Sequence, residues 1–326
     1  MSEKSLVSVV IIFLNAELFL SEAIDSVFTQ IYERWELLLV DDGSTDTSTE
    51  IAQGYAKQKP GQVYYLEHPG HHNRGKGASR NLGIQHAKGD YLAFLDADDI
   101  WLPNKLREQV DSLDKHGKVG MVYGKTLYWY SWTQNSVNSQ QDFIPKLGVE
   151  VNTPIGQPDL LPLYLRGKAS IPGPSDILVR RSAIDEVGGF DETFIGVNNI
   201  YEDQAFFAKL CLKAQIIVIN RCWNRYRQHP QASMAVAERT GTEVQARKFF
   251  LNWLERYLSE QAVKDRKVWL ALTRELWLIQ SPKWLPGRAQ KGVRWVKKWI
   301  LRIEELILPT ALSCQLWMQN SDIMAP

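Results

Sequence analysis

The sequence has no apolar run long enough to cross a membrane. Its first apolar stretch, residues 7–13, is soon followed by Asn15 and Glu17, whereas a spanning helix needs roughly 18 apolar residues. The stretch is also too short for the core of a signal peptide. We therefore expect a cytoplasmic protein, with a peripheral position on the inner face of the cytoplasmic membrane as a further option.

Cysteine is scarce, and neither sign of charge is in excess. The chain of 326 residues has three cysteines, an odd and widely spaced set that fits neither a disulfide framework nor a zinc site. The 38 basic and 37 acidic residues leave a formal net charge of +1, so no global field predicts a nucleic-acid partner. The length allows one large α/β domain with an appendage, or two modest domains.

Two common nucleotide-binding loops are missing as well. Residues 70–76 match most of the G-x-x-x-x-G-K-[ST] motif, but Gly77 replaces the hydroxyl residue that should hold Mg²⁺. The turn after the first predicted strand, FLNAE, contains no glycine, which argues against a dinucleotide-binding oxidoreductase. Both a P-loop NTPase and such an oxidoreductase are therefore disfavoured.

The first half of the chain does contain a regular alternation of strands and helices. Apolar, β-branched runs predict strands, and apolar residues at helical spacing follow most of them. Strands that are apolar on both faces and alternate with helices indicate a mostly parallel sheet covered on both sides. The predicted strands are residues 7–13, 35–40, 63–67, 91–95 and 120–124, and the predicted helices include 21–31, 77–87 and a segment after Pro103.

The second half is less regular. Residues 125–175 contain Pro, Gly, Asn and Gln in place of the alternation, and we interpret them as a partly irregular excursion over the sheet. Segments 176–190 and 201–227 predict a helix and two strands, and the pattern after about residue 230 is helical. We therefore predict an α/β domain over 1–230 and a helical C-terminal region over 231–326.

Acidic side chains follow two of the predicted strands. They are Asp41 and Asp42 after residues 35–40, and Asp96, Asp98 and Asp99 after residues 91–95. In an open parallel sheet, ligands bind beyond the carboxyl ends of the strands, so both groups should face one crevice. Carboxylates at such a place suit Mg²⁺ or Mn²⁺, which usually bind one or two of them together with water and substrate phosphates. The alternative is that Asp99 caps the next helix and the other acids are solvated.

Four stretches carry more specific information when they are taken together. They are VSVVIIFLNAELFLSEAIDSVFTQIYERWELLLVDDGSTDTS, NRGKGASRNLGIQHAKGDYLAFLDADDIWLPNKL, VGGFDE and YEDQAFFAKL. In this order and at these distances, they resemble the successive signatures of family 2 glycosyltransferases of the GT-A fold, over about residues 6–230. The family often has Pro and Tyr in the first turn, where this chain has Ile12 and Leu14. Asn15 is retained, and we expect it to contact the nucleotide sugar.

The resemblance implies a role for several other side chains. Asp42 would accept a hydrogen bond from the donor's nucleobase, Asp96 would lie near the donor ribose, and Asp98 would bind the metal on the diphosphate. Arg80 would support the nucleotide side of the crevice, and Asp203 would act as the base.

The chemistry of sugar transfer requires groups of the same kinds. A divalent ion at Asp98 would stabilise the leaving diphosphate, and a carboxylate must take the proton of the acceptor hydroxyl. Glu202 and Asp203 begin a predicted helix, where the helix dipole favours carboxylates, so either could be that base or simply a helix cap. Arg225, Arg227 and His229 could reach the diphosphate from a late strand, with plain surface charge as the alternative.

We therefore predict an inverting, metal-dependent glycosyltransferase that moves a sugar from a nucleotide-sugar donor to a hydroxyl of a cell-envelope glycan or glycolipid precursor. Asp42 has no basic residue beside it and could read the imide N–H of uracil, which favours a UDP-sugar, while GDP- and dTDP-sugars stay open. Residues 125–175 would form the wall for a glycan or lipid-linked acceptor. A nucleotidyltransferase and an inactive nucleotide-sugar-binding subunit are the alternatives.

Near the C-terminus, acidic residues are missing over a long stretch. Residues 282–302 contain no acid, and a helix starting near Gly287 would place Trp295, Trp299 and Ile303 on one face. Cationic flanks beside an aromatic and aliphatic stripe are typical of a helix that lies on an anionic membrane surface. The alternative is a tail helix whose tryptophans pack against the catalytic domain. The basic residues are Lys283, Arg288, Lys291, Arg294, Lys297, Lys298 and Arg302.

Overall fold

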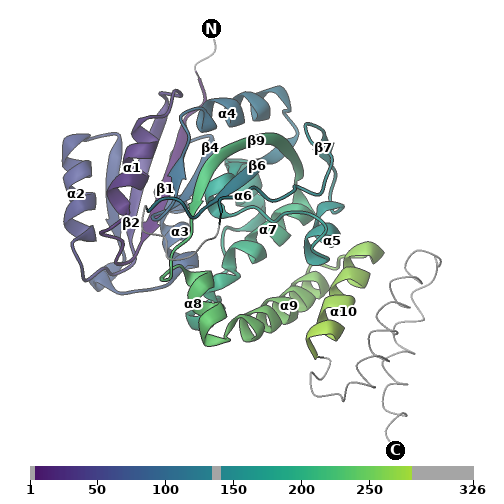
Figure 1. The fold of residues 1–326 in the computed structure, drawn as a ribbon. Helices are drawn as coiled ribbons and strands as arrows, with labels where there is room; N and C mark the ends of the chain where they lie inside the picture. The colour runs from purple at the N-terminus through teal and green to yellow at the C-terminus, as the bar shows by residue number, and fades with distance from the viewer. Residues whose placement is uncertain (1–3, 134–140, 281–326) are drawn as a thin grey trace, which may run out of the picture. The chain divides into compact units, whose positions relative to one another are not determined.

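The computed structural model describes residues 4–133 and 141–280 (Figure 1). Residues up to Ile279 form one compact unit. The strands are β1 (Val7–Phe13), β2 (Trp35–Asp41), β3 (Val63–Glu67), β4 (Tyr91–Asp96), β5 (Ile100–Trp101), β6 (Val119–Trp129), β7 (Pro154–Ile155), β8 (Leu178–Arg180) and β9 (Gln215–Arg227). The α-helices are α1 (Leu20–Phe28), α2 (Ser48–Gln58), α3 (Lys76–His86), α4 (Lys105–Lys115), α5 (Leu160–Leu165), α6 (Arg181–Val187), α7 (Glu202–Lys213), α8 (Ser233–Thr240), α9 (Glu243–Glu260) and α10 (Arg266–Gln280), and the short 3-10 helices are η1 (Pro69–His71), η2 (Pro174–Asp176) and η3 (Gly196–Ile200).

The nine strands in the described part of the chain belong to one sheet, with the order β3-β2-β1-β4-β8-β6-β9-β5 and with β7 paired to β9. The long pairings β1 with β2, β1 with β4, β2 with β3 and β6 with β9 are parallel. The short strands β5, β7 and β8 pair antiparallel with their neighbours. The α/β fold with a mostly parallel sheet, predicted from the sequence, is confirmed.

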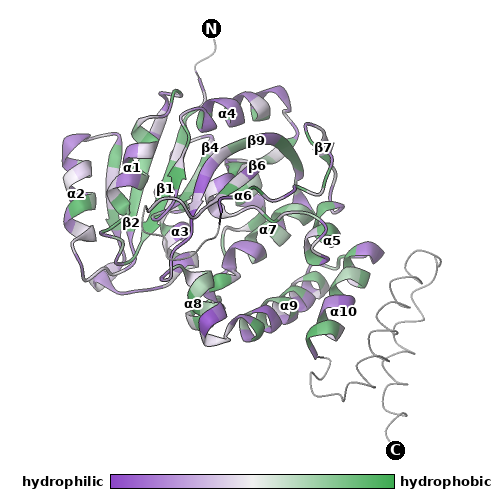
Figure 2. Cartoon of the chain, viewed as in Figure 1, coloured by the Kyte–Doolittle hydropathy of each residue, from purple (hydrophilic) through white to green (hydrophobic). Residues whose placement is uncertain are grey.

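The central strands are buried on both faces because their apolar runs have no polar alternation. All seven residues of β1 are buried, and Figure 2 shows hydrophobic residues concentrated along β1 and β2. Val9 and Ile11 pack with α1 and α4 on one face of the sheet, while Val10 and Ile12 pack in the cluster that contains α6 and α7 on the other. Helices on both faces therefore hold the carboxyl ends of β1, β2 and β4 in fixed positions.

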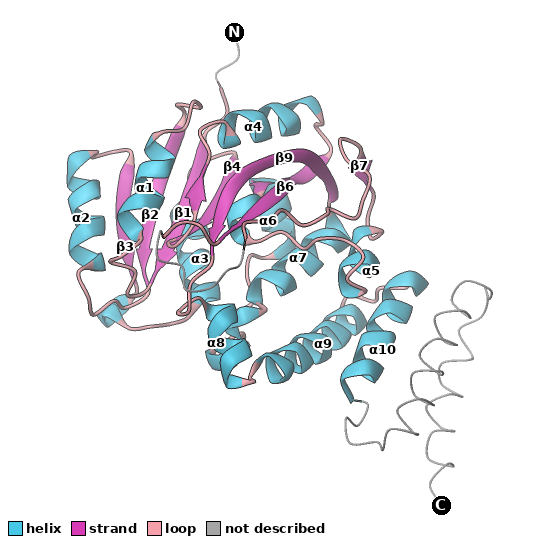
Figure 3. Ribbon diagram, viewed as in Figure 1, coloured by secondary structure: helices cyan, strands magenta, loops and turns pink. Residues whose placement is uncertain are grey.

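The expectation for residues 125–175 was partly wrong. Strand β6 continues to Trp129, and α5 lies further along the same segment. Gly124 allows this continuation, because a Cβ atom there would lie 2.4 Å from the backbone oxygen of Arg221 in β9. The ladder shifts register around Gly124, and such bulges bend strands. Figure 3 shows β9 curving alongside β6. The two strands predicted in 176–227 are β8 and β9, but α6 was missed beside α7.

Helices α8, α9 and α10 confirm the helical pattern predicted after residue 230, as far as the structure describes it. Phe250 and Trp253 of α9 and Leu272 of α10 belong to the same core cluster as the sheet. The division at residue 230 stays a prediction, and the cationic segment 282–302 lies outside the described residues. No helix in the described part of the chain combines the length and the apolar character that membrane crossing requires.

Close packing of α3 on β1 gives a test of this architecture. A Cβ atom at Gly83 of α3 would lie 2.4 Å from Cγ1 of Val10. Gly83→Ala should therefore lower the free energy of unfolding by about 1–3 kcal/mol through overpacking. The matched control is Gly54→Ala in α2, where a Cβ atom meets nothing within 4 Å. It should leave stability unchanged or raise it by up to about 1 kcal/mol. Urea unfolding of both variants makes the measurement, and equal effects would contradict the packing.

Candidate active site

A cavity of about 790 Å³ opens where β1, β2 and β4 end. Most of the residues that the sequence singled out line it, although they come from segments far apart in the chain. Arg227 and Asp41 do not line the cavity, so the expectation that Asp41 faces the crevice is wrong: its side chain is buried in its own turn. The predicted residues that line the cavity are Asn15, Asp42, Arg80, Asp96, Asp98, Glu202, Asp203 and His229.

The three acids at the end of β4 each have a different partner, which offsets part of their mutual repulsion. Asp96 Oδ1 accepts from Nη2 of Arg80 at 2.7 Å, and Asp98 Oδ2 lies 3.0 Å from Nε2 of His229. Asp99 accepts from the Ser175 hydroxyl at 2.6 Å. Burial, with the nearby acids, holds the pKa of Asp99 well above its usual value. The alternative of a helix cap at Asp99 is wrong, because β5 follows it and α4 begins only at residue 105.

Arg80 of α3 is the cation at the base of the crevice. Its side chain is 2% exposed, and it forms ion pairs with Asp96 from β4 and Glu202 from α7. Burial alone would lower the pKa of Arg80, but the two carboxylates outweigh that effect and raise it. The guanidinium thus ties the acidic turn to the start of α7. Its expected contact with the nucleotide stays a prediction.

Glu202 and Asp203 are adjacent in sequence but have different surroundings. Glu202 is buried and forms an ion pair with Arg80. Asp203 is half-buried, lines the crevice, and accepts a hydrogen bond from the Gln204 backbone N–H at 2.6 Å. Loss of solvation and the neighbouring Glu202 raise the pKa of Asp203 to about 7. A carboxyl with such a pKa can exchange a proton near neutral pH.

The acids at the end of β2 hold the backbone of neighbouring loops. Both oxygens of Asp42 accept backbone N–H groups, from Arg74 at 2.8 Å and from Gly75 at 3.1 Å. Asp41 is buried within its own turn and accepts from the Ser44 N–H at 2.7 Å. Asn15, which is exposed, accepts at Oδ1 from the Thr45 N–H at 2.7 Å. Of the two acids, Asp42 is therefore the one that faces the crevice.

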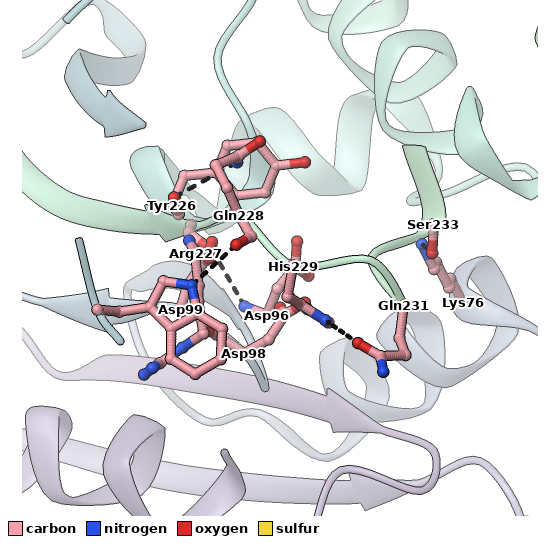
Figure 4. A network of polar contacts seen from close by, with 12 residues as sticks. Lys76, Asp96, Asp98, Asp99, Tyr226, Arg227, Gln228, His229, Gln231 and Ser233 are labelled. Atoms are coloured by element: carbon pink, nitrogen blue, oxygen red, sulfur yellow. Dashed lines mark hydrogen bonds and ion pairs between the residues drawn. The ribbon is translucent and has the colours of Figure 1, made fainter. Parts of the chain in front are cut away.

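Arg227 lies behind the acidic turn rather than in the crevice. Its Nε donates to the backbone oxygen of Asp98 at 2.8 Å, and its backbone N–H donates to Asp99 at 3.1 Å (Figure 4). The guanidinium is ion-paired with Glu22 and lies 4.7–5.0 Å from the ring centres of Phe19, Trp129 and Trp132. Arg227 therefore positions the turn, and a direct contact with a nucleotide sugar is not supported by its burial.

Sequence reasoning missed several lining residues. Lys76, in the glycine-rich segment, donates from Nζ to the Ser233 hydroxyl at 2.9 Å and so links α3 to α8 (Figure 4). Its place after a glycine-rich loop was the available signal. Tyr128 of β6 and Tyr226 of β9 also line the cavity. Their position depends on the bend near Gly124, for which the sequence offered no readable pattern.

A divalent ion would find few protein ligands at this site. No group of three or more His, Cys, Asp or Glu side chains in the described residues could hold a metal ion. Asp98 and His229 present an oxygen and a nitrogen atom 3.0 Å apart, and Asp96 is the next carboxylate in the turn. Magnesium-like ions usually take one or two protein carboxylates and complete their shell with phosphate oxygens and water. The residues present therefore fit an ion that is bound together with a diphosphate.

Comparison with known proteins agrees with this geometry. The family model described as "Glycosyl transferase family 2" matches residues 8–188. TuaG of Bacillus subtilis (strain 168), whose name refers to a glycosyltransferase of teichuronic acid biosynthesis, is 39% identical over 109 residues, which are 33% of this chain and 42% of TuaG. The chain thus spans between about a fifth and two fifths of the length of the curated relatives that it matches.

Two solved structures share the fold at low sequence identity. S. aureus TarS 1–349 in complex with UDP-GlcNAc has a TM-score of 0.55 and 18% identity, covering 84% of this chain and 80% of that one. The mannosyltransferase PcManGT from Pyrobaculum calidifontis, in complex with GDP-Man and Mn²⁺, has a TM-score of 0.58 and 17% identity, covering 99% of this chain and 82% of that one. These likenesses confirm the predicted GT-A fold.

The ion pairs of Arg80 generate a prediction about stability. Arg80→Met would leave Glu202 buried without a cation, so it should lower the free energy of unfolding by about 3–5 kcal/mol at pH 8. The loss should be smaller at pH 6, because protonation of Asp203, whose pKa is already near 7, removes one of the repelling charges. Urea unfolding at both pH values measures the difference. Arg256→Met removes a cation that pairs with Glu260 on the exposed side of α9, and this control should cost at most about 1 kcal/mol.

Proposed function

The chain belongs to glycosyltransferase family 2, and on that basis we propose that it moves a sugar from a nucleotide-sugar donor to an acceptor hydroxyl with inversion at the anomeric carbon. One observation carries the proposal. The half-buried Asp203, with its raised pKa, lines the same crevice as the acidic turn Asp96–Asp99. A proton acceptor and a site for a diphosphate thus share one cavity, as the reaction requires.

The proposed reaction is a single displacement. Asp203 takes the proton of the acceptor hydroxyl while that oxygen forms a bond to the anomeric carbon. The bond from this carbon to the diphosphate oxygen breaks, and the electron pair leaves with the nucleoside diphosphate. A divalent ion, when bound, neutralises charge on the leaving diphosphate. Asp98, with His229 beside it, is proposed to hold that ion, and Mn²⁺ in the PcManGT complex supports this choice.

The donor is proposed to lie with its nucleotide toward Asp42 and Asn15. The exposed Asn15 and the carboxylate of Asp42 line the cavity just after β1 and β2, which β4 and β8 separate from β6 and β9 in the sheet. A UDP-sugar is favoured, because an acceptor oxygen of Asp42 suits the imide N–H of uracil, and the UDP-GlcNAc complex of TarS supports it. Mn²⁺ or Mg²⁺ would serve as the cofactor.

The acceptor is proposed to be a cell-envelope glycan or its lipid-linked precursor. The name of TuaG, which refers to teichuronic acid biosynthesis, supports this class. We also propose a catalytic domain over 1–230 and a helical region over 231–326 that brings the protein to the inner face of the membrane through residues 282–302.

Nucleotide release tests the function directly. The protein should release nucleotide from at least one of UDP-GlcNAc, UDP-glucose, GDP-mannose and dTDP-glucose with Mn²⁺ present and water as the acceptor. Asp98→Asn should lower this rate by about 10²-fold or more, since an electrostatic contact to the leaving group is lost. It should also weaken Mn²⁺ binding in the presence of UDP, measured by electron paramagnetic resonance. Asp111→Asn, on the exposed side of α4, is the matched control. Full activity in EDTA would refute the metal dependence.

The pH profile tests the base. Asp203 must be ionised to accept a proton, and its pKa is about 7, so the rate should fall as pH drops through 7 and level off above it. Asp203→Asn should lower the rate by at least about 10²-fold, while the donor affinity stays within a few-fold. If Glu202→Gln remains folded and proves far more damaging than Asp203→Asn, the base is Glu202.

A further inference from the structure

One wall of the crevice is aromatic and is formed by β6 and β9, which β4 and β8 separate from β1 and β2 in the sheet. Tyr128 of β6 and Tyr226 of β9 are partners across the two strands. Their ring centres are 5.1 Å apart with the planes at 79°, and both side chains line the cavity. Neither phenol hydroxyl has a hydrogen-bond partner among the described residues, so both can serve a ligand.

The aromatic surface continues out of the crevice. Phe143 stacks on Tyr128 with ring centres 4.8 Å apart and planes at 20°, and Tyr130 stacks on Phe143 at 6.4 Å and 22°. Phe143 is 48% exposed. We name these four residues, Tyr226, Tyr128, Phe143 and Tyr130, the aromatic row. It begins in the cavity and ends on the surface.

The backbone holds the exposed end of the row in place. Tyr128 N–H donates to the Phe143 oxygen at 2.9 Å, and Phe143 N–H donates back at 3.3 Å. The Asp142 carboxylate accepts from the Tyr130 N–H at 2.7 Å and from the Ser131 N–H at 2.9 Å. These hydrogen bonds fix the half-exposed ring of Phe143 against its aromatic neighbours, so the aromatic surface reaches the solvent.

Polar groups accompany the inner end of the row. The Thr126 hydroxyl donates to the Asp176 carboxylate, and both residues line the same wall. Tyr226 is close to the acidic turn, next to Arg227 in Figure 4, and burial together with Asp99 and Asp98 raises its pKa. The phenol therefore stays protonated and can donate a hydrogen bond beside the reaction centre.

We propose that the aromatic row binds the acceptor as a chain of pyranose rings. This assignment rests on the proposed function and names its acceptor class. A pyranose ring has C–H groups that pack against aromatic surfaces, whose faces are negative, and hydroxyls that pair with phenols and carboxylates. Pockets lined by aromatic side chains with a few polar groups suit such ligands.

The length of the row favours the acceptor over the donor. A donor carries one sugar, which must stay beside the diphosphate at the acidic turn. The row continues past Tyr128 to the half-exposed Phe143 and to Tyr130, neither of which lines the cavity. An acceptor chain extends from the crevice into solvent, and so it can contact the whole row.

The experiment compares saccharide binding with donor turnover in the full-length protein. Saturation-transfer NMR measures binding of cellotetraose, chitotetraose and maltotetraose, and nucleotide release from UDP-GlcNAc with Mn²⁺ gives the donor KM. The wild type should bind at least one of the oligosaccharides. Phe143→Ala should weaken that binding about five- to tenfold, more than it changes the donor KM. Phe143→Tyr keeps the ring and should restore binding, and Tyr64→Ala, at a half-buried tyrosine of β3, should change neither quantity.

Three results would overturn the assignment. The first is that the wild type binds none of the oligosaccharides, and the second is that Phe143→Ala binds them as well as the wild type does. The third is that Phe143→Ala raises the donor KM more than it weakens oligosaccharide binding. In the last case the row serves the donor. Failure of the proposed function gives a different result, since no nucleotide sugar would then be hydrolysed by the wild type, whatever the oligosaccharides do.

Discussion

The buried ion pairs of Arg80 are the interaction on which the rest of the crevice depends. One guanidinium from α3 meets a carboxylate from β4 and another from α7, so it fixes the distance between the acidic turn and the start of α7. Burying charges is costly unless every partner is present. Asp203 lies next to this pair, and its burial together with the charge of Glu202 raises its pKa, although Arg80 acts in the opposite direction.

Near Arg80, the three acids of the turn differ in exposure because they have different partners. Asp96 is held by Arg80, and Asp99 is buried against Ser175 and the backbone of Arg227. Asp98 is 29% exposed and touches His229 through one oxygen, so it keeps the capacity to bind a ligand. Arg227 holds the backbone of the turn through a hydrogen bond, and aromatic rings enclose its guanidinium. The residue that supports the turn is therefore different from the acid that is proposed to bind the ion.

The sequence predicts well what depends on local pattern, and less well what depends on long-range contacts. The boundaries of β1 and β3 follow from apolar runs, and the convergence of Asp42 and Asp98 follows from strands ending at one edge. The burial of Arg227 could not be predicted, because the rings around its guanidinium come from distant segments. They belong to Phe19, just before α1, and to Trp129 of β6. The difference between Glu202 and Asp203 could not be predicted either, since it depends on Arg80, 122 positions away from Glu202.

The long separation of Arg80 and Glu202 in the sequence affects when the crevice can form during biosynthesis. Arg80 is synthesised long before Glu202, and the parallel pairing of β6 with β9 likewise joins distant segments. A nascent chain that ends before α7 would have to bury a guanidinium with one of its two carboxylates missing, which is unfavourable. Non-local contacts of this kind are also slow to form. The crevice is therefore expected to close late in biosynthesis, after α7 and β9 have left the ribosome, so that incomplete chains carry no assembled site.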